Sequence, residues 1–261
     1  MKSDAIFLSL LHSAVALSVP SVAPRNTEIV GGQPAKIEDF TYQAHLFRGG
    51  GGGCGGTIVS KRHIVTAAHC APYTDPAEYY VLLGSVKWDG GTKYNVTKII
   101  KDPNWDVASD DHDIAVLVLS EDIKFGPTIK AATIAKTAPA VGTMAVVSGH
   151  GILSEDEGND GGTHDLMYVN VPIFDHDECK KDYLRDNAGK ITPAMICAGY
   201  AEGGKDSCTG DSGGPLVVNN TLVGVVAFGQ GCARPNYPGV YTDVSEPSVQ
   251  KFLQDSLNIT S

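Results

Sequence analysis

Beyond residue 28 the sequence contains no apolar run that approaches the roughly 20 residues needed to span a bilayer as a helix. It also lacks the closely spaced motifs of zinc sites, because neither a C-x-x-C nor an H-E-x-x-H segment occurs. Basic residues are few: 20 Lys and Arg stand against 30 Asp and Glu, giving a net charge of −10. These absences argue against a membrane protein, a zinc protein and a nucleic-acid-binding protein.

The chain has 261 residues, of which 42% are hydrophobic, and this is enough for one large all-β domain or two small ones. Short apolar runs alternate with glycine, proline and acidic turns, and this spacing predicts many short strands in a sandwich or barrel. Such runs occupy residues 79–83, 114–119, 144–147, 216–218 and 222–228. Helical spacing of apolar residues over 247–257 predicts a C-terminal helix packed on the second half of the molecule. The segments 49–53, which is all glycine, and 154–164 predict exposed loops.

The N-terminal residues differ from the rest of the chain in composition. Lys2 precedes an apolar stretch that ends among small residues, a pattern typical of a secretory signal over residues 1–18. A short pro-segment over 19–28 would follow, and a buried N-terminal helix is the alternative. Six cysteines suit an oxidising, extracellular compartment, although the sequence alone leaves their pairing open. Glycosylation sequons begin at Asn95, Asn219 and Asn258.

One segment carries the strongest chemical signal, the Gly-Asp-Ser-Gly-Gly-Pro sequence at 210–215. Glycines around a serine let the backbone bend sharply and let a substrate approach closely. A serine nucleophile needs a base to accept its proton, and the base needs an acid to fix its tautomer. The segments Thr-Ala-Ala-His-Cys at 66–70 and Asp-Ile-Ala-Val at 113–116 supply both. The sequence therefore predicts a triad of His69, Asp113 and Ser212, with a surface turn and a structural histidine as the alternatives.

Three acids lie close together in the second of these segments, so the choice among them needs a reason. Asp113 directly precedes the apolar run 114–117, where a strand enters the interior. Asp110 and Asp111 are interpreted as solvated loop charges. The chain order of His, Asp and Ser differs from that of an α/β-hydrolase, which argues against an esterase of that fold.

These motifs resemble those of the trypsin/chymotrypsin family of serine proteases, and the resemblance runs from residue 29 to the C-terminus. Further matches are Ile-Val-Gly-Gly at 29–32, Cys-Gly-Gly at 54–56, Cys-Ala-Gly at 197–199 and Pro-Gly-Val-Tyr at 238–241. The resemblance implies a trypsin-like protease domain over 29–261. It implies an all-β fold of two six-stranded antiparallel β-barrels that meet near residues 125–145, with the active site in the cleft between them and a C-terminal helix. The segment 231–237 and the count of six cysteines look like those of secreted fungal trypsins.

The resemblance also implies three disulfides and several residue roles. The disulfides would be Cys54–Cys70, Cys179–Cys197 and Cys208–Cys232. The backbone N–H groups of Gly210 and Ser212 would form the oxyanion hole. Substrate binding would rest on Asp206 at the base of the primary pocket, which in the trypsin branch selects Arg or Lys, with Gly229 and Gly239 as pocket walls and Tyr183 behind. After cleavage, the new amino group of Ile29 would pair with Asp211 and order the site.

Four positions depart from the pattern of the family. Ala227 stands where a serine usually helps hold the catalytic acid, and Phe228 replaces the usual tryptophan. His150 lies in a segment where Gly-Trp-Gly is common. Glu28 precedes Ile29, where trypsin precursors usually present Lys or Arg. The first three would alter rate or substrate fit, and the fourth concerns the activating enzyme.

We therefore expect a secreted serine endopeptidase that cleaves after Arg or Lys through an acyl-enzyme intermediate. No cofactor and no metal are expected, since residues 83–94 lack a carboxylate cluster for calcium. The expected partners are protein and peptide substrates carrying Arg or Lys, protease inhibitors and a separate activating protease, with no nucleic acid and no membrane. A monomer is expected. The alternative is a catalytically weak or silent homologue that binds proteins through the same cleft.

Overall fold

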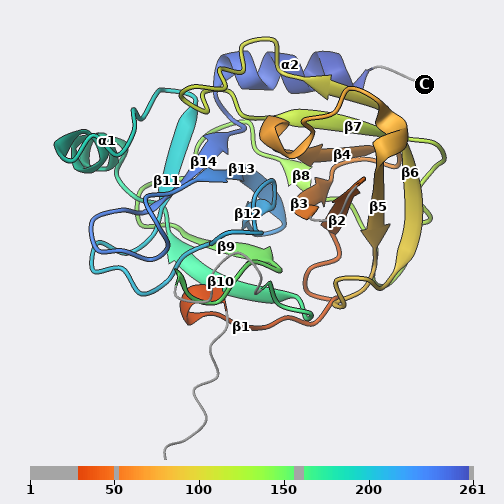
Figure 1. Ribbon diagram of the computed structural model, residues 1–261, viewed down its shortest axis with the longest axis horizontal. Coiled ribbons are helices and arrows are strands. Elements are labelled where there is room, and N and C mark those ends of the chain that lie inside the picture. Colours follow the sequence, from red (N-terminus) through yellow and green to blue (C-terminus); the bar gives the residue numbers. More distant parts are fainter. Residues whose placement is uncertain (1–28, 50–52, 156–161, 259–261) are drawn as a thin grey trace, which may run out of the picture.

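The computed structural model describes residues 29–49, 53–155 and 162–258, which fold mainly into β-strands in two groups (Figure 1). The predicted signal, the pro-segment and parts of both predicted loops lie outside the described residues. The first group closes into a barrel in the order β2-β3-β4-β7-β6-β5. Its antiparallel strands are β2 (Gln43–Arg48), β3 (Gly53–Ile58), β4 (His63–Thr66), β5 (Tyr79–Leu83), β6 (Thr92–Lys101) and β7 (Ala115–Leu119).

The second group is an eight-stranded sheet in the order β1-β10-β9-β12-β13-β14-β11, with β8 paired in parallel to β13. Its strands are β1 (Gln33–Pro34), β8 (Thr133–Ile134), β9 (Met144–Gly149), β10 (Met167–Pro172), β11 (Met195–Ala198), β12 (Pro215–Val218), β13 (Thr221–Phe228) and β14 (Gly239–Asp243). A tight turn at Asn219 and Asn220, both with positive φ, joins β12 to β13. The two groups bracket the site described below.

The expectation of two closed six-stranded barrels is wrong for this second sheet. Strands β10 and β11 approach each other at a single antiparallel bridge between Ile173 and Ala198, and no ladder extends from it. The reason is visible in the register. Strand β1 pairs with β10 at Met167 and Tyr168, so only the far end of β10 is free to meet β11. Strand β11 has four residues and ends at Ala198.

The described residues include two α-helices, α1 (His176–Arg185) and α2 (Pro247–Leu257). Each begins after an acidic cap, Asp175 or Glu246, whose side chain accepts hydrogen bonds from N–H groups of the first turn. Short 3-10 turns occur at Ile29–Gly31 (η1), Ala68–Cys70 (η2) and Pro76–Glu78 (η3). The C-terminal helix is confirmed, and it lies against β7 of the closed barrel (Figure 1). Its Gln250 also donates to the carbonyl of Val244, which follows β14.

Side chains from both groups of strands form one continuous hydrophobic core, and a smaller cluster surrounds Cys179 and Tyr183 of α1. The structure contains the three disulfides that the resemblance implied, Cys54–Cys70, Cys179–Cys197 and Cys208–Cys232. The sequon asparagines Asn95, Asn219 and Asn258 are all exposed. None of the helices in the described part of the chain is long and apolar enough to cross a membrane.

Candidate active site

His69 and Asp113 lie side by side at one end of the closed barrel. His69 is in η2, and its Nδ1 is 2.5 Å from Oδ2 of Asp113, while its backbone N–H donates to Oδ1 at 2.9 Å. Asp113 is fully buried just before β7. Burial acts to lower the pKa of His69, but the hydrogen bond and charge of Asp113 outweigh it, so the pKa is raised overall. With Nδ1 engaged, Nε2 is the nitrogen left to accept a proton.

The carboxylate of Asp113 depends on His69 alone for its hydrogen bonds within the described residues. Its backbone carbonyl accepts from Thr242 Oγ1 at 2.8 Å, which anchors it to β14. Ala227, where the family usually has a serine, is buried and offers no hydroxyl. The position of this acid is therefore set largely by the backbone around it.

Ser212 lies in the loop between β11 and β12. Its carbonyl accepts from the N–H of Gly55 at 2.8 Å, which ties this loop to β3 of the barrel. No hydrogen bond joins Ser212 to His69 among the described residues, but both line one cavity of about 500 Å³. Hydrogen bonds between catalytic groups often tighten only when substrate binds. The structure therefore brings the predicted nucleophile and base to one open site.

Two backbone donors stand free beside this serine. The N–H groups of Gly210 and Ser212 donate to no backbone carbonyl in the described part of the chain. Gly210 has φ +102°, and a Cβ there would lie 3.0 Å from Cα of Gly151, so only glycine fits without strain. Free N–H groups beside a nucleophile suit an oxyanion.

Asp206 lies in a second cavity of about 380 Å³ that Ser212 also lines. The residue is 2% exposed. Its Oδ2 accepts from the N–H of Ala233 at 2.9 Å, whereas Oδ1 is buried without a hydrogen-bond partner among the described residues. Burial outweighs these hydrogen bonds and raises the pKa of Asp206 to about 7. A buried carboxylate oxygen left without a partner suits a ligand that brings a positive charge.

Glycines keep this second cavity open. A Cβ at Gly239 would lie 2.6 Å from Oδ1 of Asp206, so any side chain there would cover the carboxylate. Gly229 also lines the cavity. Tyr183 lies behind it, where its hydroxyl donates to the carbonyl of Pro238 at 2.8 Å. The cavity can therefore take a long side chain whose charged end reaches Asp206.

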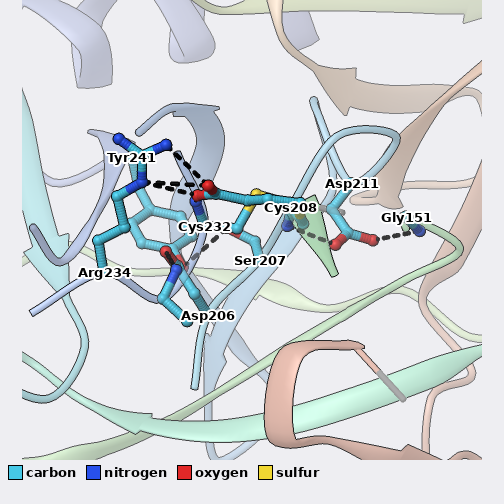
Figure 2. Close-up of a disulfide and its surroundings, with 10 residues drawn as sticks. Gly151, Asp206, Ser207, Cys208, Asp211, Cys232, Arg234 and Tyr241 are labelled. Atoms are coloured by element: carbon cyan, nitrogen blue, oxygen red, sulfur yellow. Dashed lines mark hydrogen bonds and ion pairs between the residues drawn. A yellow bond between two sulfur atoms is a disulfide. The ribbon is translucent and has the colours of Figure 1, made fainter. Parts of the chain in front are cut away.

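An ion pair that the sequence did not suggest lies at the rim of this cavity. The guanidinium of Arg234 donates from Nη2 at 2.7 Å and from Nε at 3.1 Å to the carboxylate of Glu155, which lines the cavity. The N–H of Cys232 donates to the same carboxylate. Figure 2 shows Arg234, Asp206 and Asp211 around the Cys208–Cys232 disulfide. Glu155 and Arg234 are 79 residues apart, so no local sequence signal could pair them.

Asp211 and Ile29, the predicted activation pair, are both fully buried. The carboxylate of Asp211 accepts from the N–H groups of Gly151 at 2.8 Å and Cys208 at 2.9 Å, and within the described residues it has no bond to Ile29. Burial raises the pKa of Asp211 to about 6. The segment after Ile29 touches the pocket directly, since the N–H of Asp206 donates to the carbonyl of Val30 at 3.2 Å.

His150, one of the four departures from the family, lines the same cavity as His69. Its ring lies 4.2 Å from that of His45 and 5.4 Å from that of Trp88, between centroids. Burial lowers the pKa of His150 to about 4, and burial together with His150 lowers that of His45 to about 3. Both rings are neutral at ordinary pH, so His150 acts as an aromatic wall. Phe228 lines the Asp206 cavity.

One group of three potential metal ligands occurs among the described residues, namely Cys54, His69 and Cys70. The two cysteines are joined in a disulfide, so they offer no thiolate. This group does not suit a metal ion while the disulfide is intact.

Comparison with known proteins gives a consistent result. The Trypsin family model matches residues 29–253. A vitellin-degrading protease of Bombyx mori is 41% identical over 246 residues, which cover 93% of this chain and 91% of the relative. A trypsin of Simulium vittatum is 44% identical over 225 residues, covering 83% and 88%, and hypodermin-A of Hypoderma lineatum is 45% identical over 218 residues, covering 83% of each. These relatives come from insects, so they do not support the expected likeness to fungal trypsins. The chain belongs to the trypsin family and is a serine endopeptidase.

Proposed function

We propose that this endopeptidase is secreted and cleaves peptide bonds on the carboxyl side of Arg or Lys. Asp206 carries the proposal. Its carboxylate lies at 2% exposure in a cavity that reaches Ser212, and its Oδ1 has no hydrogen-bond partner among the described residues. A guanidinium or ammonium group at this point would supply that partner and offset the cost of the buried charge.

The chemistry follows from the geometry around Ser212. Its hydroxyl attacks the carbonyl carbon of the substrate while Nε2 of His69 accepts the proton, and the same nitrogen then delivers that proton to the leaving amine. Asp113, 2.5 Å from Nδ1, fixes the tautomer and stabilises the imidazolium. The N–H groups of Gly210 and Ser212 bind the oxygen that becomes negative. Water then hydrolyses the acyl-enzyme by the same steps in reverse.

The domain organisation is part of the proposal. Residues 1–18 act as a secretory signal and 19–28 as an activation segment, and the three disulfides suit an oxidising compartment. The protease domain begins at Ile29. Release of its amino group places a positive charge beside the buried carboxylate of Asp211, which burial otherwise disfavours as an anion. The substrates are proteins and peptides carrying Arg or Lys.

A cleavage profile tests the specificity. Enzyme that begins at Ile29 is compared with Asp206→Ser on peptide libraries that vary the residue before the scissile bond, with Ser212→Ala as the inactive control. The parent enzyme should cut after Arg and Lys, and D206S should lose about 100-fold or more of kcat/KM on these substrates because one partner of a desolvated pair is gone. D206S should still form an acyl-enzyme with aromatic esters. A D206S profile still dominated by Arg and Lys would show that another residue sets specificity.

A further inference from the structure

The loop that leads into Asp113 is conformationally unusual. Asp110 and His112 both have φ +53°, in the left-handed region that non-glycine residues seldom adopt. Such a backbone persists only when its surroundings hold it in place. The loop also carries the catalytic acid of the proposed triad, so whatever holds it sets the position of that acid.

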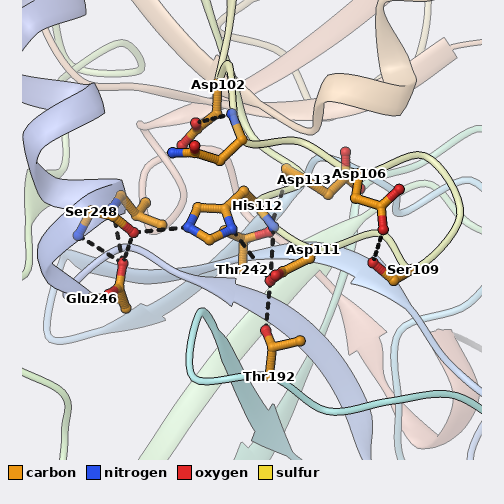
Figure 3. Close-up of polar contacts among 12 residues, drawn as sticks. Asp102, Asp106, Ser109, Asp111, His112, Asp113, Thr192, Thr242, Glu246 and Ser248 are labelled. Atoms are coloured by element: carbon orange, nitrogen blue, oxygen red, sulfur yellow. Dashed lines mark hydrogen bonds and ion pairs between the residues drawn. The ribbon is translucent and has the colours of Figure 1, made fainter.

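His112 makes one of the contacts that fix this loop, and Figure 3 shows it between Ser248 and Asp111. Its Nε2 lies 2.8 Å from Oγ of Ser248, in α2. The hydroxyl of Ser248 donates to the carboxylate of Glu246, so the imidazole must be the donor in its own contact with Ser248. Nδ1 then faces Oδ1 of Asp111 at 3.3 Å.

Asp111 makes a second set of contacts that fix the loop. It was expected to be a solvated loop charge, but it is partly buried, and its Oδ1 accepts from Thr192 Oγ1 at 2.5 Å and from the N–H of His112 at 3.1 Å. Thr242 of β14 fixes the carbonyl of Asp113. Thr192 precedes β11 and Thr242 lies in β14, so these two anchors belong to the half of the molecule that carries Ser212. Ser248 lies in α2, which follows β14 in the chain and packs against β7 of the closed barrel.

This placement matters because the catalytic groups come from different halves. His69 and Asp113 belong to the closed barrel, whereas Ser212 lies in the second half. Within the described residues the carboxylate of Asp113 is held only by His69. A shift of the loop would therefore move the carboxylate of Asp113 against His69, because within the described residues no side chain other than that of His69 is bonded to this carboxylate.

We propose that His112 is a positioning residue for the catalytic acid: its hydrogen bond to Ser248 fixes the loop of Asp113 to α2, the helix that follows β14 in the chain. The inference rests on the proposed triad. The charged groups that face the imidazole are Asp111 on its own loop, Glu246 at the start of α2 and Asp102 after β6. His112 also precedes Asp113 directly.

The contact between Ser248 and His112 is not a second nucleophilic site. The proton of Ser248 goes to Glu246, so the imidazole has no serine proton to accept. The N–H groups of Ser248 and Val249 are also already bound to Glu246, which leaves no donor there for an oxyanion. The arrangement is suited to anchoring.

The test uses activated enzyme with His112→Ala, and His112→Asn as the conservative variant whose amide can still donate to Ser248. Small displacements of a catalytic group cost rate more than binding. H112A should lower kcat about tenfold on an Arg ester and leave KM within twofold. The acid limb of the kcat profile should move to lower pH, because Asp113 is what raises the pKa of His69.

H112N should recover most of kcat. His164→Ala, at an exposed histidine, is the matched control and should change neither value.

Ser248→Ala removes the acceptor without touching the loop, and it carries the test if H112A does not fold. It should shift kcat and the acid limb in the same direction as H112A. An unchanged acid limb in both H112A and S248A, or a loss of kcat/KM that lies wholly in KM, would overturn the proposal. Full activity of S212A would instead overturn the triad itself, so the two failures are distinguishable.

Discussion

Asp206 is a buried carboxylate whose pKa burial raises strongly. It keeps its proton up to a pH of about 7 in the folded protein, whereas its ordinary value is 3.8. Because the folded state binds more protons between these values, the stability that this group contributes is fully present below about pH 4 and is lost as the pH rises to about 7. At about 1.4 kcal/mol per pKa unit, the ionised group costs up to about 4 kcal/mol in the substrate-free enzyme.

This cost can be measured directly. Ser212→Ala is used as the parent to prevent self-digestion, and the free energy of unfolding in urea is compared with that of the double variant carrying Asp206→Asn. The free energy of unfolding of the Asn variant should rise relative to that of its parent as the pH increases from 4.5 to 8, since an amide has no charge to bury. Asp211 is present in both proteins, and its charge is one of the causes that raise the pKa of Asp206 in the parent. A difference that stays constant across this pH range would contradict the burial argument.

The sequence signal for single residues is strongest where one segment carries all of it. Ser212 and Asp206 lie in one continuous segment, and His69 adjoins a cysteine that fixes its loop. Asp113 was chosen by its place before a buried strand, and the structure buries it fully. His112 could not be found this way, because its partner Ser248 lies 136 residues further along the chain.

At the scale of the elements, an ion pair joins the two loops that border the Asp206 cavity. Glu155 follows β9, Arg234 lies between β13 and β14, and their ion pair neutralises the rim. The side chains are 31% and 50% exposed, so salt weakens the pair but does not abolish it. Removing one of the two charges would leave the other one, an anion or a cation, unpaired at the mouth of the cavity.

Arg234→Gln and Glu155→Gln should therefore have opposite effects. R234Q leaves a carboxylate at the rim and should lower KM for Arg substrates two- to fivefold at low salt, whereas E155Q leaves a guanidinium there and should raise KM by a similar factor (order-of-magnitude estimates). Initial rates at about 0.01 M and 0.5 M salt check this, since both effects should shrink at the higher salt. Changes of KM in the same direction would indicate a mechanical tie between the loops instead.

The strands themselves illustrate what periodicity can predict. Apolar runs at 114–119 and 222–228 became β7 and β13, and the run at 247–257 became α2, because local burial patterns set these elements. The open form of the second sheet was not predictable in the same way. It depends on β1 occupying the edge of β10, a pairing between residues 33–34 and 167–168 that no local pattern encodes.

At the scale of the whole molecule, the halves are joined around the site by specific polar bonds. Ser148 of β9 donates to Gln43 of β2 at 2.7 Å, and Thr242 of β14 donates to the carbonyl of Asp113. Within the second half, the buried segment at Ile29 contacts Asp206 through Val30. A new amino terminus at Ile29 would thus lie one residue from the hydrogen bond between Val30 and Asp206.

The precursor should therefore not activate itself productively. An Arg-specific enzyme can cut after Arg25, but this leaves Asn26, Thr27 and Glu28 attached to Ile29. At about 3.3 Å per extended residue, the new amine lies roughly 10 Å from where it must pair with Asp211. Glu28 would also bring a negative charge toward that buried carboxylate, whose pKa burial already raises to about 6.

A different protease, or an aminopeptidase that trims three residues, should be required. The purified precursor is incubated alone and with culture medium of the producing cells, and the N-terminus of each active fraction is sequenced. Activity should appear only with the medium and should coincide with chains that begin at Ile29. A precursor with Glu28→Arg is the matched control, and it should activate itself because its own specificity then matches the bond before Ile29. Full activity of a form that begins at Asn26, or Ile29 produced by the unaltered precursor alone, would contradict the requirement for a second enzyme. Because the proposed Ile29–Asp211 pair needs a protonated amine, activity of the mature form should fall when this amine deprotonates in alkali.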